Sequence, residues 1–91
     1  MDTVRLRISG KVQGVGYRIW ATRVAAGLDL RGWVRNRVDG SVEMLVTGAP
    51  QNIAAMIEAS RDGPPGAHVS DVIATPERDD GSRGFAARPT E

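Results

Sequence analysis

The loop Gly10–Arg18 holds the residues of this chain that are best suited to chemistry. Its sequence is GKVQGVGYR, with glycines at positions 10, 14 and 16, and it lies between an alternating apolar segment and the start of a helical pattern. Glycines let backbone N–H groups approach a ligand closely, and a helix N-terminus carries partial positive charge. Arg18, in the first turn of that helix, can add a two-pronged, charge-assisted contact. Together these features predict a cradle for a phosphate group.

Two considerations limit this interpretation of the loop. Glycine-rich connections between strands and helices also occur as plain turns, and from the glycine content alone a plain turn is the commoner explanation. The loop also lacks the Lys-Ser/Thr ending of a P-loop and the G-x-G-x-x-G order of a dinucleotide site. ATP and NAD are therefore poorly supported as ligands.

The composition excludes several other kinds of site. The chain has 91 residues with no cysteine and one histidine, which excludes disulfides, thiolate metal sites, a cysteine nucleophile and a histidine-rich metal cage. Its 12 basic and 11 acidic residues give a net charge of +1, unlike a protein that binds nucleic acid or an anionic membrane through bulk charge. No apolar run approaches the ~20 residues of a membrane span, and the first residues form no signal-peptide core. We expect a soluble, cytoplasmic protein.

Other polar and aromatic residues have simpler explanations than catalysis. His68 follows a Pro-Pro-Gly-Ala segment and is predicted to be a solvated loop residue, and the adjacent Asp79–Asp80 pair is predicted to be solvated in a turn rather than to bind metal. Glu43 has no partner that the sequence reveals. Trp20 and Trp33 are predicted to pack in or beside the core. Six arginines are predicted to form exposed faces, with a basic rim that attracts an anionic substrate as the alternative: Arg5, Arg7, Arg23, Arg31, Arg35 and Arg37.

The spacing of apolar residues predicts two helices and four strands. Val4, Leu6 and Ile8 alternate with polar residues, as in a half-buried strand, and the spacing becomes helical from Tyr17. The predicted elements are a strand over 4–9, a helix over 17–27, strands over 30–37 and 41–47 joined by a turn, a helix that opens at 50, and a strand over 69–75. Pro89 has no N–H for a ladder hydrogen bond, so we expect no long strand after Phe85 and a loose end at 89–91.

This order of elements predicts a ferredoxin-like βαββαβ sandwich, an α+β fold. The two helices would cover one face of a mostly antiparallel sheet of four or five strands. The length allows a single domain, residues 1–91. Because this architecture hosts many functions, the function has to come from the site residues.

Two segments resemble the two signatures of the acylphosphatase family. The first family pattern, Gly-x-Val-Gln-Gly-Val-x-(Phe/Tyr)-Arg, is met by residues 10–18. The second is Gly-aromatic-apolar-basic-Asn, followed by Gly and Val in a hairpin and by a later Gly. It is met by Gly32, Trp33, Val34, Arg35, Asn36, Gly40, Val42 and Gly48. The resemblance covers roughly residues 4–85, and the family has the same ferredoxin-like fold.

The resemblance implies hydrolysis of acyl phosphates to a carboxylate and inorganic phosphate, with no metal and no cofactor. It implies that Arg18 grips the phosphate and that Asn36 orients the attacking water. The backbone N–H groups implied to complete the cradle are those of Gln13, Gly14, Val15, Gly16, Tyr17 and Arg18. The implied partners are a small-molecule acyl phosphate, and inorganic phosphate as product and inhibitor. We expect a monomer that binds neither nucleic acid nor membranes.

Two other classes of function stay open. A binding module of the same fold could hold a carbamoyl- or phosphate-bearing ligand, or a nucleic acid, without turnover, as acylphosphatase-like domains occur within larger maturation enzymes; the short chain favours a stand-alone hydrolase. RNA-binding modules of this fold carry aromatic residues on their central strands, and residues 4–9 include none. A structural or regulatory subunit is disfavoured by the presence of both Arg18 and Asn36.

Overall fold

Alternation of side chains along the first strand sets the two faces of the sheet. The computed structural model describes all residues, 1–91, and in it Leu6 and Ile8 are fully buried while Arg5 and Arg7 point to the opposite face. The elements are β1 (Asp2–Lys11), α1 (Tyr17–Gly27), β2 (Arg31–Asn36), β3 (Val42–Gly48), α2 (Pro50–Asp62), β4 (His68–Pro76) and β5 (Phe85–Arg88). All the predicted helices and strands are therefore present, with bounds shifted by a few residues.

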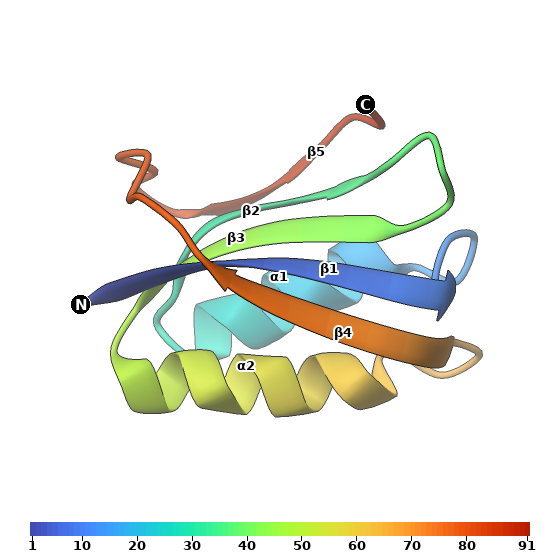
Figure 1. Ribbon diagram of the computed structural model, residues 1–91, viewed down its shortest axis with the longest axis horizontal. Helices are drawn as coiled ribbons and strands as arrows, with labels where there is room; N and C mark the ends of the chain where they lie inside the picture. Colours follow the sequence, from blue (N-terminus) through green and yellow to red (C-terminus); the bar gives the residue numbers. More distant parts are fainter.

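The five strands form one sheet in the order β4-β1-β3-β2-β5. Neighbouring strands are antiparallel, except that β5 runs parallel to β2. Both helices lie against the same face of this sheet (Figure 1), which confirms the predicted ferredoxin-like α+β sandwich. No helix of the protein is long and apolar enough to cross a membrane. Both β1 and β2 pair antiparallel with β3, so they run in the same direction. The loop after β1 and the end of β2 therefore lie at the same end of the sheet.

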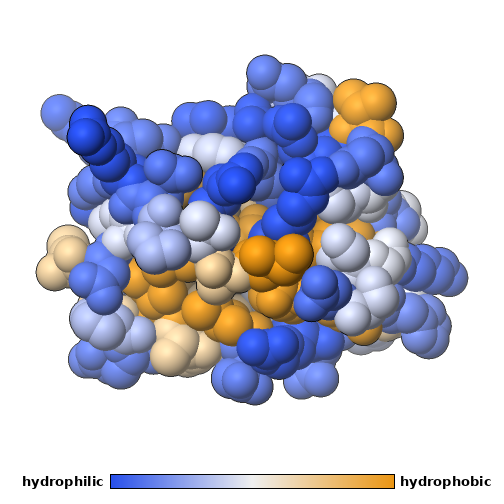
Figure 2. Space-filling view, in the orientation of Figure 1, coloured by the Kyte–Doolittle hydropathy of each residue, from blue (hydrophilic) through white to orange (hydrophobic).

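The core lies between the sheet and the two helices. Small residues of α1, Ala21 and Ala25, and larger ones of α2, Ile53 and Met56, are buried against the sheet. In Figure 2, apolar side chains gather between α2 and β4 at the edge of this core. The core thus fixes α1 against the sheet. The first residue of α1, Tyr17, is part of the buried cluster.

The helix-free face of the sheet is covered by its own side chains. Trp33 and Leu45 are 8% and 4% exposed although they lie outside the main core. The guanidinium groups of Arg35 and Arg88 lie over the Trp33 ring, 4.7 and 4.8 Å from its centroid. The long apolar stems of arginines can cover such residues while their charged ends stay in water. The arginines of this face therefore cover apolar side chains and also carry the surface charge.

Acidic side chains hold the arginines and the tryptophan of this face. Glu43 was expected to lack a partner, but its carboxylate accepts hydrogen bonds from Arg5 at 3.0 Å and from Arg35 at 2.8 Å. Asp79 and Asp80 are exposed in their turn, yet Asp79 pairs with an arginine and Asp80 accepts a hydrogen bond from the Trp33 indole N–H at 3.0 Å. The expectation of an unpartnered Glu43 is thus wrong. Its partner Arg5 lies 38 residues away in the sequence, so only the strand register brings the two together.

The C-terminal segment is ordered by β2. The last strand has four residues, in keeping with the expectation that it would be short. The prediction of a loose end at 89–91 is wrong: Pro89 interrupts the ladder, but the Glu91 N–H donates to the Asn36 carbonyl at 3.0 Å. The Glu91 carboxylate also pairs with Arg35 at 2.8 Å. Pairing with β2 therefore resumes beyond the proline.

Candidate functional site

The loop between β1 and α1 turns through two glycines in the left-handed region. Gly14 has φ 75° and Gly16 has φ 78°, values that other L residues adopt only with strain. A side chain at either position would meet no atom within 4 Å, so it is the backbone conformation that requires glycine. This conformation turns the chain from the strand directly into the first turn of α1.

Backbone N–H groups in this loop have no partner within the protein. Gly16 caps α1 without any side-chain hydrogen bond, and the first turn of the helix holds no acidic residue. None of the N–H groups of residues 13–19 donates to a carbonyl or side chain of the protein. Unpaired amides at a helix N-terminus attract anions, because each is a free donor and the helix dipole adds positive potential. The loop therefore presents a run of free donors.

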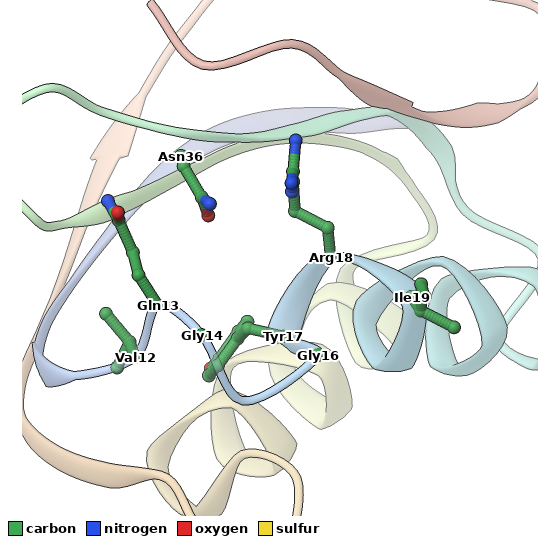
Figure 3. Close-up of a pocket in the computed structure, with 8 residues that line it drawn as sticks. All are labelled: Val12, Gln13, Gly14, Gly16, Tyr17, Arg18, Ile19 and Asn36. Atoms are coloured by element: carbon green, nitrogen blue, oxygen red, sulfur yellow. The ribbon is translucent and has the colours of Figure 1, made fainter.

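Arg18 is held beside this loop by the last strand. Its Nη1 donates to the Arg88 carbonyl of β5 at 3.0 Å, and no acidic side chain forms an ion pair with it. Figure 3 shows the Arg18 side chain extending from the start of α1 toward the sheet. The guanidinium is thus anchored through one nitrogen, with its charge uncompensated by any carboxylate.

Asn36 faces the loop from the sheet. It is the last residue of β2 and is half-buried. In Figure 3 its side-chain amide points from the strand toward the loop. Its backbone carbonyl accepts the hydrogen bond from Glu91 described above, which fixes the end of the strand. A side-chain amide offers both a donor and an acceptor, so it can hold a water molecule or a phosphate oxygen.

Gln13 connects the loop to the β2–β3 hairpin with its side chain. Its Nε2 donates to the Arg37 carbonyl at 2.8 Å and to the Ser41 carbonyl at 2.9 Å. Sequence reasoning had assigned to this residue only a backbone role. The signal that could have revealed more is its type, since Gln13 is the one side chain of the loop with two neutral N–H donors. This contact holds the loop in register with the hairpin that follows Asn36.

Tyr17 anchors the start of α1 in the core. It is 2% exposed, and its hydroxyl donates to the Ser60 carbonyl of α2 at 2.7 Å. Burial raises the pKa of Tyr17 to about 12, against a smaller opposite effect of that hydrogen bond. The phenol therefore stays protonated in the physiological range and serves as an anchor for the first helical turn.

These residues line an open cavity of about 140 Å³. Of the predicted site residues, it brings together Gln13, Gly14, Gly16, Tyr17, Arg18 and Asn36. Val15 does not line the cavity, because its side chain packs against the core, while Val12 and Ile19 do line it and had not been predicted. His68, Asp79 and Asp80 lie outside the lining. The cavity thus combines free amides and a guanidinium on the helix side with an amide side chain on the sheet side.

Comparisons with known proteins show which family the chain resembles. The family model described as Acylphosphatase matches residues 4–87. The chain is 50% identical over 90 residues to a protein named acylphosphatase from Rhodospirillum rubrum, which covers 99% of both chains. The crystal structure of acylphosphatase from Bacillus subtilis superposes with a TM-score of 0.93 at 36% identity, covering 97% of this chain and 99% of that one.

A second kind of structural match places the fold inside a larger protein. The crystal structure of T. kodakarensis HypF superposes with a TM-score of 0.85 at 31% identity, covering 97% of this chain but 12% of that one. The family model over residues 4–87 and the relative that is 50% identical along nearly the whole chain show that this chain belongs to the acylphosphatase family.

Proposed function

We propose that this protein hydrolyses the carboxyl–phosphate bond of acyl phosphates, releasing a carboxylate and inorganic phosphate. The observation that supports this most directly is the run of unpaired N–H groups over residues 13–19, beside Arg18 and opposite Asn36. The phosphoryl oxygens would accept from these amides and from the guanidinium. The product phosphate would occupy the same donors, so it should inhibit.

The residues in the cavity suffice for this reaction because an acyl phosphate already carries a good leaving group. A carboxylate leaves without help from a strong general acid. The remaining tasks are to hold the phosphoryl group, align a water molecule and stabilise the charge on the phosphoryl oxygens, and enzymes achieve phosphoryl transfer mainly by positioning and electrostatics. Arg18 supplies a permanent positive charge, so we propose that no metal ion or other cofactor takes part.

Asn36 would orient the attacking water. Its neutral side chain is not a strong base, but its amide can hold water through both oxygen and nitrogen. The water oxygen attacks phosphorus, the bond between phosphorus and the acyl oxygen breaks, and the electron pair leaves with the carboxylate. The proton of the water passes to the phosphoryl oxygens or to solvent, with no protein base required. The active unit would be a monomer, since one chain holds all these groups.

The test is hydrolysis of benzoyl phosphate in the presence of EDTA by wild type, Arg18→Ala and Asn36→Ala. We expect metal-independent turnover by wild type only. Protection from heat by inorganic phosphate should survive in Asn36→Ala and be lost in Arg18→Ala, because only the arginine contributes a charged contact to the phosphate. Equal protection of both variants would refute the role of Arg18. Folded wild type that binds phosphate but shows no turnover above the spontaneous rate would instead indicate a binding module.

A further inference from the structure

The last turn of α2 leaves a buried carbonyl for which the backbone supplies no donor. A helix has no intrahelical partner for its last four carbonyl groups. The Gly63 N–H donates to the Ala59 carbonyl at 3.0 Å, and Pro64 has no N–H to offer the carbonyl of Ser60. Ser60 is fully buried, so solvent does not reach it. Its carbonyl therefore depends on the Tyr17 hydroxyl, which donates to it at 2.7 Å.

The Tyr17 side chain connects this end of α2 to the cavity. Tyr17 is the first residue of α1 and lines the cavity. Its ring lies on the backbone of Gly63, where an added Cβ would be 2.8 Å from the ring atom Cε2. The ring is thus held by packing at its edge and by the hydrogen bond at its end. Tyr17 therefore joins the C-terminal end of α2 to the N-terminal end of α1.

A second residue of the loop rests on the connection between α2 and β4, residues 63–67. Val15 packs against the core, and an added Cβ at Gly66 would lie 3.8 Å from its Cγ1, an ordinary contact distance. The amides of the loop have no partner within the protein, so they do not hold the loop in place themselves. Gln13 fixes the start of the loop against the hairpin. Val15 and Tyr17 fix the rest of it against the end of α2.

We infer that Tyr17 is a positioning residue for the proposed reaction, acting through its hydroxyl on the backbone amides that hold the phosphoryl group. This inference rests on the proposed hydrolysis of acyl phosphates and adds to it the residue that aligns the cradle with α2. The hydroxyl donates to Ser60, so it acts on the phosphoryl group only through the backbone. Without it, the first turn of α1 can shift relative to α2. Such a shift misaligns the amides, and phosphoryl transfer depends on their placement.

The test uses Tyr17→Phe, which keeps the ring and removes one oxygen. The family pattern has phenylalanine or tyrosine at this position, so the variant should keep the fold. Thr47→Val is the matched control, because it also removes one hydroxyl from a nearly buried residue. Thr47 is 2% exposed, and its Oγ1 lies 2.8 Å from that of Thr3 near the start of β1, at the end of the sheet away from the cavity. Both variants should melt below wild type.

The affinity for phosphate separates positioning from stability. We expect the Kd of inorganic phosphate, measured by calorimetry well below the melting temperatures, to rise about 3- to 10-fold in Tyr17→Phe, as for the loss of about one hydrogen bond. The KM for benzoyl phosphate should rise by a similar factor with kcat nearly unchanged, because the amides hold the phosphoryl group in the ground state and the transition state alike. Thr47→Val should keep the Kd, KM and kcat of wild type.

Different outcomes separate this inference from the proposed function. A lower melting temperature of Tyr17→Phe with the Kd and KM of wild type would overturn the inference, because the hydroxyl would then serve stability alone. Equal losses of phosphate affinity in Tyr17→Phe and Thr47→Val would also overturn it, since affinity would then follow stability. Wild type that binds phosphate without turnover would refute the proposed function, and the Kd values would decide the inference by themselves. Wild type that does not bind phosphate would overturn both.

Discussion

Gln13 offers the sharpest test of how the site is positioned. Its Nε2 donates to the carbonyls of Arg37 and Ser41, which lie on either side of the hairpin turn after Asn36. Replacing Gln13 with alanine removes both hydrogen bonds and frees the loop from the hairpin. Replacing it with glutamate keeps the size and shape but turns the two donors into acceptors. The two variants therefore separate the loss of a contact from its reversal.

The size of the alanine effect can be worked from the partners. The Ser41 carbonyl also accepts from the Arg37 N–H at 2.8 Å, and the Arg37 carbonyl also accepts from the Gly40 N–H at 3.1 Å. Neither carbonyl loses its last partner in Gln13→Ala, so the full penalty for burying an unsatisfied group does not apply. Two hydrogen bonds at net values near the middle of the usual range give a loss of about 1–2 kcal/mol in the free energy of unfolding.

The glutamate variant should be more severe. At neutral pH its carboxylate would face two carbonyl oxygens and would also repel an incoming phosphoryl group. We expect kcat/KM for benzoyl phosphate to fall about 10-fold in Gln13→Ala and 100-fold or more in Gln13→Glu, about the scale that misplacement of reacting groups costs. At lower pH the introduced carboxyl takes up a proton and can donate to one carbonyl, so the deficit should narrow as the pH falls.

The assay is kcat/KM for both variants from pH 5 to pH 8, together with urea denaturation at each pH. Arg18 and Asn36 are unchanged in both variants, so the loss in Gln13→Ala reports position, and the further loss in Gln13→Glu reports the introduced charge. Equal activity and equal stability of Gln13→Ala and Gln13→Glu at neutral pH would refute the reasoning, because the side chain would then not be held by its Nε2 donors. A Gln13→Glu deficit that stays constant with pH would refute the proposed electrostatic cause.

Two further predictions concern the residues that support the site. Burial would raise the pKa of Glu43, but hydrogen bonds from Arg35 and Arg5 outweigh it and lower the pKa below the ordinary glutamate value. The ionised Glu43 carboxylate therefore stabilises the fold fully above the ordinary glutamate pKa. This stabilisation is lost as the pH falls through the lowered pKa of the folded state. Glu43→Gln should cost roughly 2–4 kcal/mol at pH 7, and denaturation curves of the two proteins should converge at acid pH; a constant difference would contradict this account. Deletion of residues 89–91 removes the Glu91 contact with the Asn36 carbonyl and should lower kcat/KM about 10-fold, whereas Glu91→Gln, which loses only an exposed ion pair, should stay within about twofold of wild type. Equal activity of the truncated and full-length proteins would show that Asn36 is held by β3 alone.

The sequence could predict the elements and the fold because both depend on local spacing. Val4, Leu6 and Ile8 report the two faces of β1, and the change to helical spacing at Tyr17 locates the start of α1. Arg18 could be predicted as a phosphate contact from its place after the glycine-rich loop. Asn36 could be predicted as a site residue only through the family resemblance, since nothing in its spacing requires it to line the same cavity. The strand order, in which β3 lies between β1 and β2, supplies that proximity.

The contacts that the sequence could not predict are those set by register between distant strands. Glu43 meets Arg5 because both side chains lie on the same face of two antiparallel strands, and a shift of one strand by one residue would place them on opposite faces. The return of Glu91 to β2 depends on the register of the parallel ladder between β5 and β2. The sequence does not reveal this register, and Pro89, which has no N–H, argued against further pairing. Val15 lies within the predicted phosphate loop, yet its apolar side chain is drawn to the core rather than to the cavity.

The side chains on the helix-free face of the sheet also support the proposed site, which lies at the ends of β1 and β2. A site made of amides, one arginine and one asparagine holds no reactive group, so its effect depends on how accurately these parts are placed. Glu43 holds Arg35 of β2, and β2 ends in the residue proposed to orient water. Arg88 covers Trp33 with its side chain and anchors Arg18 with its carbonyl. The same layer of arginines that shields this face from water also fixes the strand and the guanidinium on which the site depends.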